Sequence, residues 1–351
     1  NNETANACAL DQCMARCKEM MNWDEKFPAK TLPNGHIRSV GVAMAMQGSC
    51  ISFVDEANVT IKMNDDGFYS LLVGSTDMGT GSDTILAQMA ADVLECDLDD
   101  VVTYGVDTDT SPYDSGSYAS STTYLTGNAV VKAAEQLRQN ITEQAAKRLE
   151  CPKDEVEFDG KVLTCVSTGN SITLKDLANQ LQGGTEGWQS VTAGGNSPVS
   201  PPPYMVGMVE IDLDPETGKV VPLKYTACVD CGTVVNPNLA RVQTEGGLMQ
   251  GLGMALYEGQ NYSDTGFNRM RNFMQYKIPT RMDVPDIEVD FRQSYEPTGP
   301  FGAKSIGEIV INTPSPALAH AIFNATGVMH HELPILPEHV WRGIQQKQQQ
   351  G

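Results

Sequence analysis

Residues 182–203 place the strongest constraint on how this chain can fold. The segment is rich in Gly, Ser, Thr and Pro, and it contains three consecutive prolines at residues 201–203. Such a composition favours turns and interrupts helices and sheets, as is typical of a linker. The sequence therefore predicts two lobes, residues 36–181 and residues 204–351, preceded by an N-terminal extension over residues 1–35.

Each predicted lobe mixes β-hairpins with helices. In the first lobe, residues 58–73 alternate apolar and polar side chains around the turn residues 64–67, which indicates a hairpin. In the second lobe, residues 215–218 separate two further strand-like runs. Helical spacing or capping residues predict helices at residues 9–21, 84–94, 129–149, 174–181 and 316–326. Hairpins and helices within one lobe predict the α+β class.

The composition argues against several classes of function. The 351 residues include 44 acidic and 24 basic side chains, a formal net charge of -20 at pH 7. Nucleic acid is therefore not an expected partner, because phosphates bind basic surfaces. No apolar run approaches the ~20 residues that span a bilayer, so no membrane partner is expected. An odd number of cysteines, nine, and the lack of a secretory pattern favour a cytoplasmic protein.

Four polar segments flanked by glycines contain the candidate functional residues. The first, residues 74–82, leaves an expected strand and enters an expected helix. Its backbone N–H groups around Gly79, Thr80 and Gly81 can bind an anion such as a phosphate. An ordinary turn at the start of a helix is the alternative.

The second segment, residues 116–123, carries a hydroxyl on nearly every side chain and precedes a long helix. Tyr118, Ala119, Ser120 and Ser121 lie at its centre. Such a run suits hydrogen bonding to a polyanionic cofactor. A loop that only caps the following helix is the alternative.

The third segment follows Asn236-Pro237 and begins at Gln243, with several glycines up to Gly253. A glycine inside a helix costs up to ~1 kcal/mol relative to alanine. Either close helix packing or a ligand lying against the backbone would offset that cost. Both explanations remain open from the sequence.

The fourth segment, residues 302–311, contains Glu308 between Gly307 and a run of β-branched apolar residues. A carboxylate that loses part of its hydration beside such neighbours is a stronger proton acceptor and suits a general base. The alternatives are an exposed loop glutamate and an ion pair with Lys304.

Together, in this order and at these separations, the four segments resemble the second half of the molybdenum-binding subunit of the xanthine dehydrogenase family. The resemblance runs from about Ile37 to Trp341. Glu308, preceded by Gly307 and Lys304, resembles the active-site glutamate motif of that family.

The other segments resemble stretches of the family that contact molybdopterin. Residues 236–253 look like its later cofactor-binding stretch, and residues 116–121 resemble the loop that runs close to the pterin and the metal. Thr80 is a departure, because many members have Gln at this point of a Gly-Gln-Gly sequence. The Thr side chain is shorter and donates one hydrogen bond.

The resemblance implies a molybdopterin cytosine dinucleotide that holds molybdenum through its dithiolene, with no side chain as metal ligand. It implies that Glu308 is the catalytic base, while the cofactor carries the redox chemistry. The residues implied to contact the cofactor are Gly79, Thr80, Gly81, Tyr118, Ala119, Ser120, Ser121, Gln243, Lys304 and Gly307.

The chain lacks the Gly-Gly-Phe-Gly-type motif of the family's first half. It therefore resembles the medium molybdopterin subunit of nicotinate dehydrogenase and related purine hydroxylases. The implied partners are a larger molybdopterin-binding subunit, an iron–sulfur subunit with 2Fe-2S clusters and an FAD subunit. The implied reaction hydroxylates an aromatic N-heterocycle, of nicotinate or purine type, with oxygen from water. An aldehyde or other oxidoreductase of the family, and a non-catalytic structural subunit that completes the cofactor cavity, are the alternatives.

Two cysteine patterns resemble redox or cluster sites. Cys228 and Cys231 have the spacing of a redox pair, but their place at the end of an expected strand favours core cysteines. The spacing of Cys8, Cys13 and Cys17 does not match the common ferredoxin patterns. The sequence therefore predicts no iron–sulfur cluster on this chain.

Overall fold

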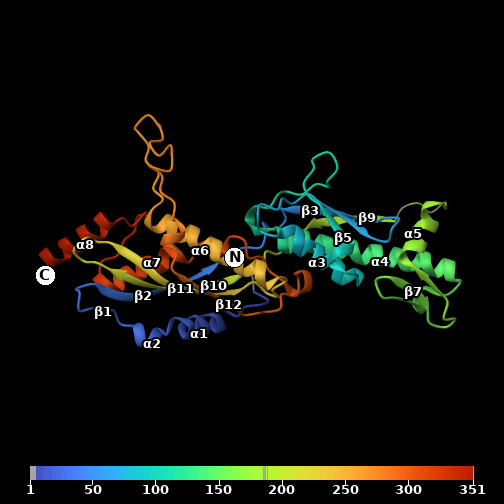
Figure 1. Ribbon diagram of the computed structural model, residues 1–351, viewed down its shortest axis with the longest axis horizontal. Helices are drawn as coiled ribbons and strands as arrows, with labels where there is room; N and C mark the ends of the chain where they lie inside the picture. Colours follow the sequence, from blue (N-terminus) through green and yellow to red (C-terminus); the bar gives the residue numbers. More distant parts are fainter. Residues whose placement is uncertain (1–4, 185–186, 188, 351) are drawn as a thin grey trace. The chain divides into compact units, whose positions relative to one another are not determined.

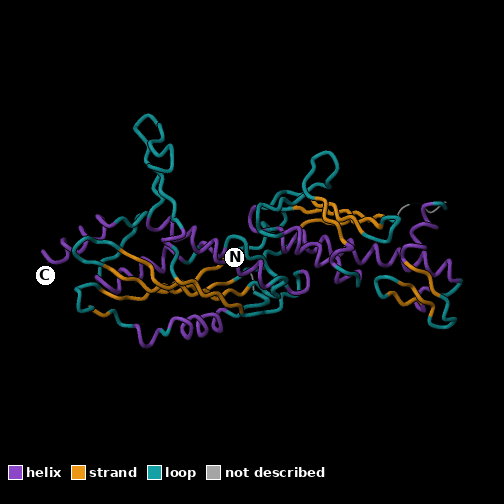
Figure 2. Tube along the Cα trace, in the orientation of Figure 1, coloured by secondary structure: helices purple, strands orange, loops and turns teal. Residues whose placement is uncertain are grey.

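The computed structural model describes residues 5–184, 187 and 189–350. Within them the chain forms two compact units, each built from strands and helices (Figures 1 and 2). Unit 1 comprises the residues up to 47, residues 202–294 and the residues from 306 onward, and unit 2 comprises residues 48–201 and 295–305. The expected α+β class is confirmed.

Unit 1 is built on a five-stranded sheet in which only the last two strands run parallel. In spatial order the strands are β1 (Lys30–Thr31), β2 (Ile37–Met46), β10 (Tyr204–Leu213), β11 (Val220–Asp230) and β12 (Asp286–Phe291). Its helices are α1 (Leu10–Met21), α2 (Trp23–Lys26), α6 (Pro237–Leu256), α7 (Pro314–Thr326) and α8 (Pro337–Gln350). The short helices η5 (Arg281–Asp283) and η7 (Ile309–Ile311) complete it.

The central strand β10 is buried on both faces. Met205, Val209 and Ile211 enter the core that α6 and α7 cover, while Val206 and Met208 enter a second core under α1. Successive side chains of a strand point to opposite faces, so one strand supplies both cores. A strand covered on both faces has a nearly continuous apolar sequence, as β10 does.

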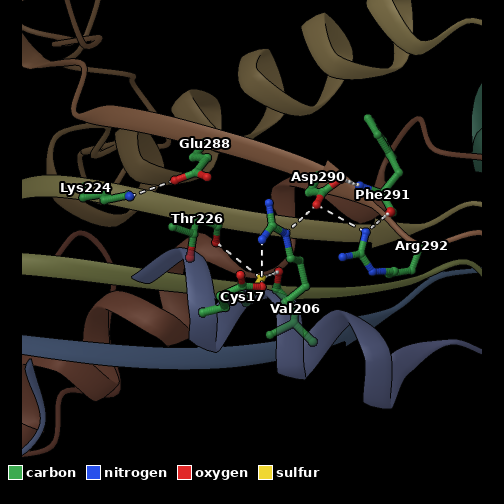
Figure 3. Close-up of polar contacts among 10 residues, drawn as sticks. Cys17, Val206, Lys224, Thr226, Glu288, Asp290, Phe291 and Arg292 are labelled. Carbon is green, nitrogen blue, oxygen red and sulfur yellow. Dashed lines mark hydrogen bonds and ion pairs between the residues drawn. The ribbon is translucent and has the colours of Figure 1, made fainter. Parts of the chain in front are cut away.

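Residues 1–35 were expected to form an extension, but the described part of this segment, with helices α1 and α2, forms a layer of unit 1. Helix α1 packs on the sheet, and the Sγ of Cys17 donates a hydrogen bond to the Val206 carbonyl at 3.2 Å (Figure 3). Burial raises the pKa of this thiol well above its usual range, so it stays protonated. An ion pair of 2.6 Å between Arg16 and Asp290 connects α1 to β12.

The sequence predicted that the first lobe begins at residue 36, but the structure places the boundary between the units after residue 47. β2 runs antiparallel to β10 over ten residue pairs, from Ile37 opposite Leu213 to Met46 opposite Tyr204. Residues 36–47, expected in the first lobe, therefore belong to the unit that contains most of the second. Local composition could not indicate this, because the pairing joins strands that are distant in the sequence.

The expected linker, residues 182–203, also differs from the structure. It contains β9 (Ser190–Asn196), which pairs with seven residues of β3 (Glu56–Met63) in unit 2. Residues 185, 186 and 188 of this segment lie outside the described residues. One unit boundary, between residues 201 and 202, lies within the expected linker.

Unit 2 contains a four-stranded sheet and a smaller three-stranded sheet. The first has the order β5 (Val101–Tyr104), β4 (Tyr69–Val73), β3 and β9, with α3 (Ser82–Leu94) and α4 (Gly127–Leu149) as its helices. The second consists of β6 (Val156–Phe158), β7 (Val162–Cys165) and β8 (Ser171–Thr173), followed by α5 (Leu174–Gln182). The predicted hairpin over residues 58–73 and the predicted helices of this region are confirmed.

None of the helices that the structure describes combines the length and the apolar character needed to cross a membrane.

The glycines of α6 have two different roles. A Cβ on Gly251 would lie 2.9 Å from the Ile311 carbonyl oxygen and 2.7 Å from the Pro314 Cγ, and a Cβ on Gly247 would overlap Val310. These two glycines allow η7 and the start of α7 to approach the helix closely. Gly246 has nothing within 4 Å of such a Cβ, so the glycine-rich sequence serves helix packing at some positions only.

We expect Gly251→Ala to lower the free energy of unfolding by about 1–3 kcal/mol, because backbone atoms would have to move to admit the methyl group. Gly246→Ala is the matched control in the same helix. It should raise the stability by about 0.5–1 kcal/mol, because alanine is the better helix former. Urea unfolding followed by circular dichroism measures both. Equal effects of the two variants would contradict this packing role.

Candidate cofactor-binding and catalytic site

The predicted site residues fall in both units. Gln243, Gly307 and Glu308 belong to unit 1, and the rest belong to unit 2: Gly79, Thr80, Gly81, Tyr118, Ala119, Ser120, Ser121 and Lys304. Each unit positions its own set through local contacts.

In unit 1, Gln243 and Gly307 are in direct contact. The Gln243 Nε2 donates a hydrogen bond of 2.9 Å to the Gly307 carbonyl oxygen. Gln243 lies on α6, so the helix holds the backbone immediately before Glu308. Two segments that the sequence singled out separately are therefore joined in the folded chain.

Glu308 stands at the N-terminal end of η7. The following residues, Ile309 and Val310, are 0% and 1% exposed, whereas the Glu308 side chain itself is exposed. The apolar run thus packs into the core and anchors the turn, but it does not desolvate the carboxylate. Within this chain, Glu308 corresponds to the alternative of an exposed loop glutamate.

Two residues beside Glu308 were not among the predicted site residues. The Gln47 Nε2 lies 3.5 Å from the Glu308 Oε2, and the Asn312 Nδ2 lies 3.4 Å from the Gln47 Oε1. These are long hydrogen bonds, but they orient the Gln47 amide toward the carboxylate. Gln47 follows β2 directly, so only the pairing of β2 with β10 brings it to this end of unit 1.

In unit 2, the first glycine loop binds one of the protein's own carboxylates. The Asp77 Oδ1 accepts hydrogen bonds from the backbone N–H groups of Gly79 at 2.9 Å and Gly81 at 3.2 Å, and its Oδ2 accepts one from Asp83 at 3.2 Å. The predicted anion-binding N–H groups are therefore already engaged. The Thr80 hydroxyl is directed at the same carboxylate, with Oγ1 at 3.5 Å from Oδ1.

The charge state of this loop follows from these contacts. Burial alone would raise the pKa of Asp77, but hydrogen bonds from the backbone of Asp83, Gly79, Gly81 and Thr80 lower it below its usual range. Burial raises the pKa of Asp83, and the neighbouring charge of Asp77 raises it further. Asp77 is therefore the stable anion at the start of α3.

Two buried serine hydroxyls of this loop make no hydrogen bond to the described residues. Ser75 and Ser82 are 1% and 4% exposed, and their Oγ atoms have no hydrogen-bond partner among the described residues. Most buried polar groups in proteins are hydrogen-bonded, so unsatisfied hydroxyls indicate missing acceptors. The loop thus retains donors even though Asp77 uses its backbone N–H groups.

The second segment, residues 116–123, packs beside the first loop. The Ser117 hydroxyl donates a hydrogen bond of 2.9 Å to the Thr76 carbonyl oxygen, which joins the two loops. Ala119 and Ser120 are consecutive non-glycine residues with φ angles of 51° and 56°. Left-handed backbone at such residues is strained and is concentrated at binding sites.

Neighbouring contacts of the second segment fix its shape. The Tyr118 hydroxyl donates a hydrogen bond of 2.7 Å to Asp55, which raises the pKa of the tyrosine. The Ser121 hydroxyl donates to the Gly116 carbonyl oxygen at 2.9 Å. Both side chains therefore support the loop. Lys304 is only 1% exposed, so it is a buried residue of unit 2 and not part of a surface ion pair.

The prediction that Cys228 and Cys231 are core cysteines can be checked in the structure. Cys228 and Cys231 are 0% and 4% exposed and unbridged, as expected of core cysteines. In the part of the chain that the structure describes, no three His, Cys, Asp or Glu side chains form a group that could hold a metal ion.

We expect Asp77→Ala to lower the free energy of unfolding at pH 7 by about 0.5–2 kcal/mol, as for a lost helix cap. The pKa of Asp77 is lower in the folded chain than its unfolded value of about 3.9. Its stabilising contribution is therefore complete above that value and is lost as the pH falls through the folded-state pKa. Urea unfolding at several pH values should show wild type and variant converging in acid.

Asp99→Ala is the control, because Asp99 is an exposed aspartate of the same unit. It should leave the stability nearly unchanged throughout. A difference between Asp77→Ala and wild type that persists undiminished well below the unfolded pKa would contradict the assigned contacts.

Residues 16–285 match the molybdopterin cofactor-binding domain family. The chain belongs to this family. The probable hypoxanthine oxidase XdhD of Escherichia coli is 35% identical over 347 residues, which are 97% of this chain and 36% of that protein. The nicotine 6-hydroxylase large subunit of Paenarthrobacter nicotinovorans is 30% identical over 85% of this chain and 38% of its own length.

Among solved structures, quinoline 2-oxidoreductase from Pseudomonas putida 86 superposes with a TM-score of 0.89 at 23% identity. The match covers 98% of this chain and 46% of that chain, and it bears on the fold. The resemblance to molybdopterin-binding subunits of the xanthine dehydrogenase family is confirmed. This chain spans less than half the length of each of these three relatives.

Proposed function

We propose that this chain is one part of the molybdopterin-binding unit of a multi-subunit molybdenum hydroxylase. The observation that carries the proposal is the family match together with the Gln243–Gly307 contact, which fixes the backbone in front of Glu308. The proposed substrate is an aromatic N-heterocycle of nicotinate or purine type. The similarity to a probable hypoxanthine oxidase and to a nicotine hydroxylase subunit supports this class, because both names denote N-heterocycles.

The polar groups of unit 2 fit a cofactor with a phosphate-bearing tail. The hydroxyls of Ser75 and Ser82 have no acceptors among the described residues. The space where a side chain would start at Gly79 is open, with no atom within 4 Å of a Cβ built there. With Thr80 and Ser120, these residues would hold the cofactor, which we propose to be molybdopterin cytosine dinucleotide. A phosphate must compete with Asp77 for the loop N–H groups, and the Ser75 and Ser82 hydroxyls are buried within the loop.

The bound cofactor supplies molybdenum redox chemistry. Glu308 is the general base, and its carboxylate removes a proton from the water-derived oxygen that attacks the substrate. The Gln47 Nε2 lies 3.5 Å from that carboxylate and can donate to it. Gln243 keeps the Gly307 carbonyl, and hence the start of the turn, in place.

The remaining parts of the enzyme would come from partner chains. We propose a larger molybdopterin-binding subunit, an iron–sulfur subunit with 2Fe-2S clusters and an FAD subunit, in the cytoplasm. A partner surface near Glu308 would also supply the desolvation that this chain alone does not provide, since the carboxylate is exposed here. The same exposure favours, as a second candidate, a structural subunit that completes the cofactor cavity without supplying the base.

Metal and nucleotide analysis of the complex purified from its native host is the first experiment. We expect stoichiometric molybdenum, and cytosine nucleotide released on acid hydrolysis, together with iron and flavin on co-purifying chains. An intact, partner-bound preparation without molybdenum would contradict the proposed function.

Glu308→Gln tests the proposed base. The amide cannot accept the proton, so turnover should fall by about 100- to 10,000-fold, with molybdenum content and subunit composition unchanged. Glu332→Gln, which removes an exposed glutamate of the same unit, is the matched control and should retain wild-type turnover. Near-normal turnover by Glu308→Gln in the loaded complex would favour the structural subunit.

A further inference from the structure

A long loop leaves unit 1 directly after α6. Residues 257–285, here called the arm, project away from the sheet and helices of their unit (the orange segment of Figure 1) and are drawn as loop in Figure 2. The arm contains only one isolated bridge, between Tyr262 and Asn268, and the short helix η5. It returns to the unit at β12.

The arm has a defined shape of its own. The Arg269 backbone N–H donates to the Asn261 carbonyl oxygen at 2.8 Å, and the Tyr276 hydroxyl donates to Glu258 at 2.6 Å. The hydroxyl and carboxylate of a Thr280–Asp283 capping box close its last turn. A loop held by internal hydrogen bonds loses less conformational entropy on binding than a disordered one.

The arm carries the most exposed of the large apolar side chains that the structure describes. Met282, Met274 and Phe273 are 92%, 86% and 78% exposed, more than any other large apolar residue that the structure describes. Single exposed apolar residues are common, but a group of them on one projecting segment indicates a contact surface. Aromatic and methionine side chains are also enriched at the centres of protein interfaces.

The charge of the arm is opposite to that of the chain. Residues 266–282 contain no acidic residue and four basic ones, Arg269, Arg271, Lys277 and Arg281, on a chain of net charge -20. All four are exposed, and none pairs with a carboxylate among residues 5–184, 187 and 189–350. The Arg271 guanidinium instead lies 5.1 Å from the centre of the Phe267 ring, so cationic and apolar groups share one surface.

We propose that the arm is a docking element that inserts into an apolar pocket, rimmed by carboxylates, on the polypeptide that carries the rest of the molybdopterin-binding unit. This inference rests on the proposed function. Two observations select that occupant. The match to XdhD covers only 36% of that protein, and the proposed function places the rest of the molybdopterin-binding unit outside the matched residues. The exposed basic groups are complementary to an acidic surface, and complementary charges are typical of specific interfaces.

Other occupants fit the arm less well. It contains no amphipathic helix to lie in a bilayer interface, and the chain's net charge opposes an anionic membrane. A second copy of the chain is also acidic and could receive the arm in a two-fold pair, but it would not supply the rest of the molybdopterin-binding unit on which the proposed function depends. The crosslinking experiment below would identify either a membrane or a second copy of the chain.

Photo-crosslinking in the native complex identifies the occupant. Phe273 is replaced by p-benzoylphenylalanine in the full chain, the complex is purified from its host and irradiated, and the crosslinked peptides are sequenced by mass spectrometry. We expect the peptides to come from a chain related to the part of XdhD that the present sequence does not match. Crosslinks to a second copy, to an iron–sulfur or flavin chain, to lipid, or to nothing in an assembled complex would overturn the proposal.

Two double variants then separate the apolar from the ionic contribution. Phe273→Ser with Met274→Ser should reduce the co-purified partner about tenfold or more, as for central interface residues. Arg271→Glu with Lys277→Glu should weaken binding most at low salt, because screening already reduces the attraction at high salt. Met329→Ser and Arg342→Glu, exposed residues of unit 1 outside the arm, are the controls.

Two further measurements distinguish failure of the docking role from failure of the proposed function. Thermal melting of each variant checks the fold, which should not change because the replaced side chains are exposed. Molybdenum in the wild-type complex tests the function. If the wild-type complex contains molybdenum but the arm variants still retain their partner, the docking role is wrong and the proposed function stands.

Discussion

The ten-residue pairing between β2 and β10 is the contact on which most of unit 1 depends. It brings together segments more than 150 residues apart in the sequence and makes β10 a central strand. β10 supplies one core on each face, and these cores hold α6 and α7 on one side and α1 on the other. The same pairing carries Gln47 to Glu308 and so contributes to the candidate site.

The sequence predicted what depends on near neighbours. The hairpin of β3 and β4 follows from alternation around Asn64–Gly67, and the start of α5 follows from Thr173, whose hydroxyl accepts a hydrogen bond from the Asp176 N–H. Both signals lie within a few residues, so no tertiary information is needed. The assignment of residues 36–47 to a unit required a partner strand from another part of the chain, and composition does not encode partners.

Some contacts of the candidate site could likewise be predicted from the sequence, and others could not. Glu308 and Gln243 belong to sequence segments that can be singled out by their glycines, and the contact of Gln243 with Gly307 joins them. The carboxylate of Asp77 in the first loop was not predicted, because whether a loop binds an external anion or its own aspartate depends on the fold of that loop. The glycines of α6 show the same limit, since Gly246 and Gly251 are equivalent in sequence and different in space.

Each unit is assembled from separate stretches of the chain, which limits where the gene can be cut without breaking a folded unit. The chain passes between the units after residues 47, 201, 294 and 305, so neither unit is a continuous stretch of polypeptide. A gene fragment that ends within residues 182–203 would encode β1 and β2 without β10, and would leave these two strands of unit 1 attached to unit 2. Recombination at that Gly- and Pro-rich segment would therefore not exchange folded modules. Each unit is therefore completed only by sequence that lies on both sides of the other.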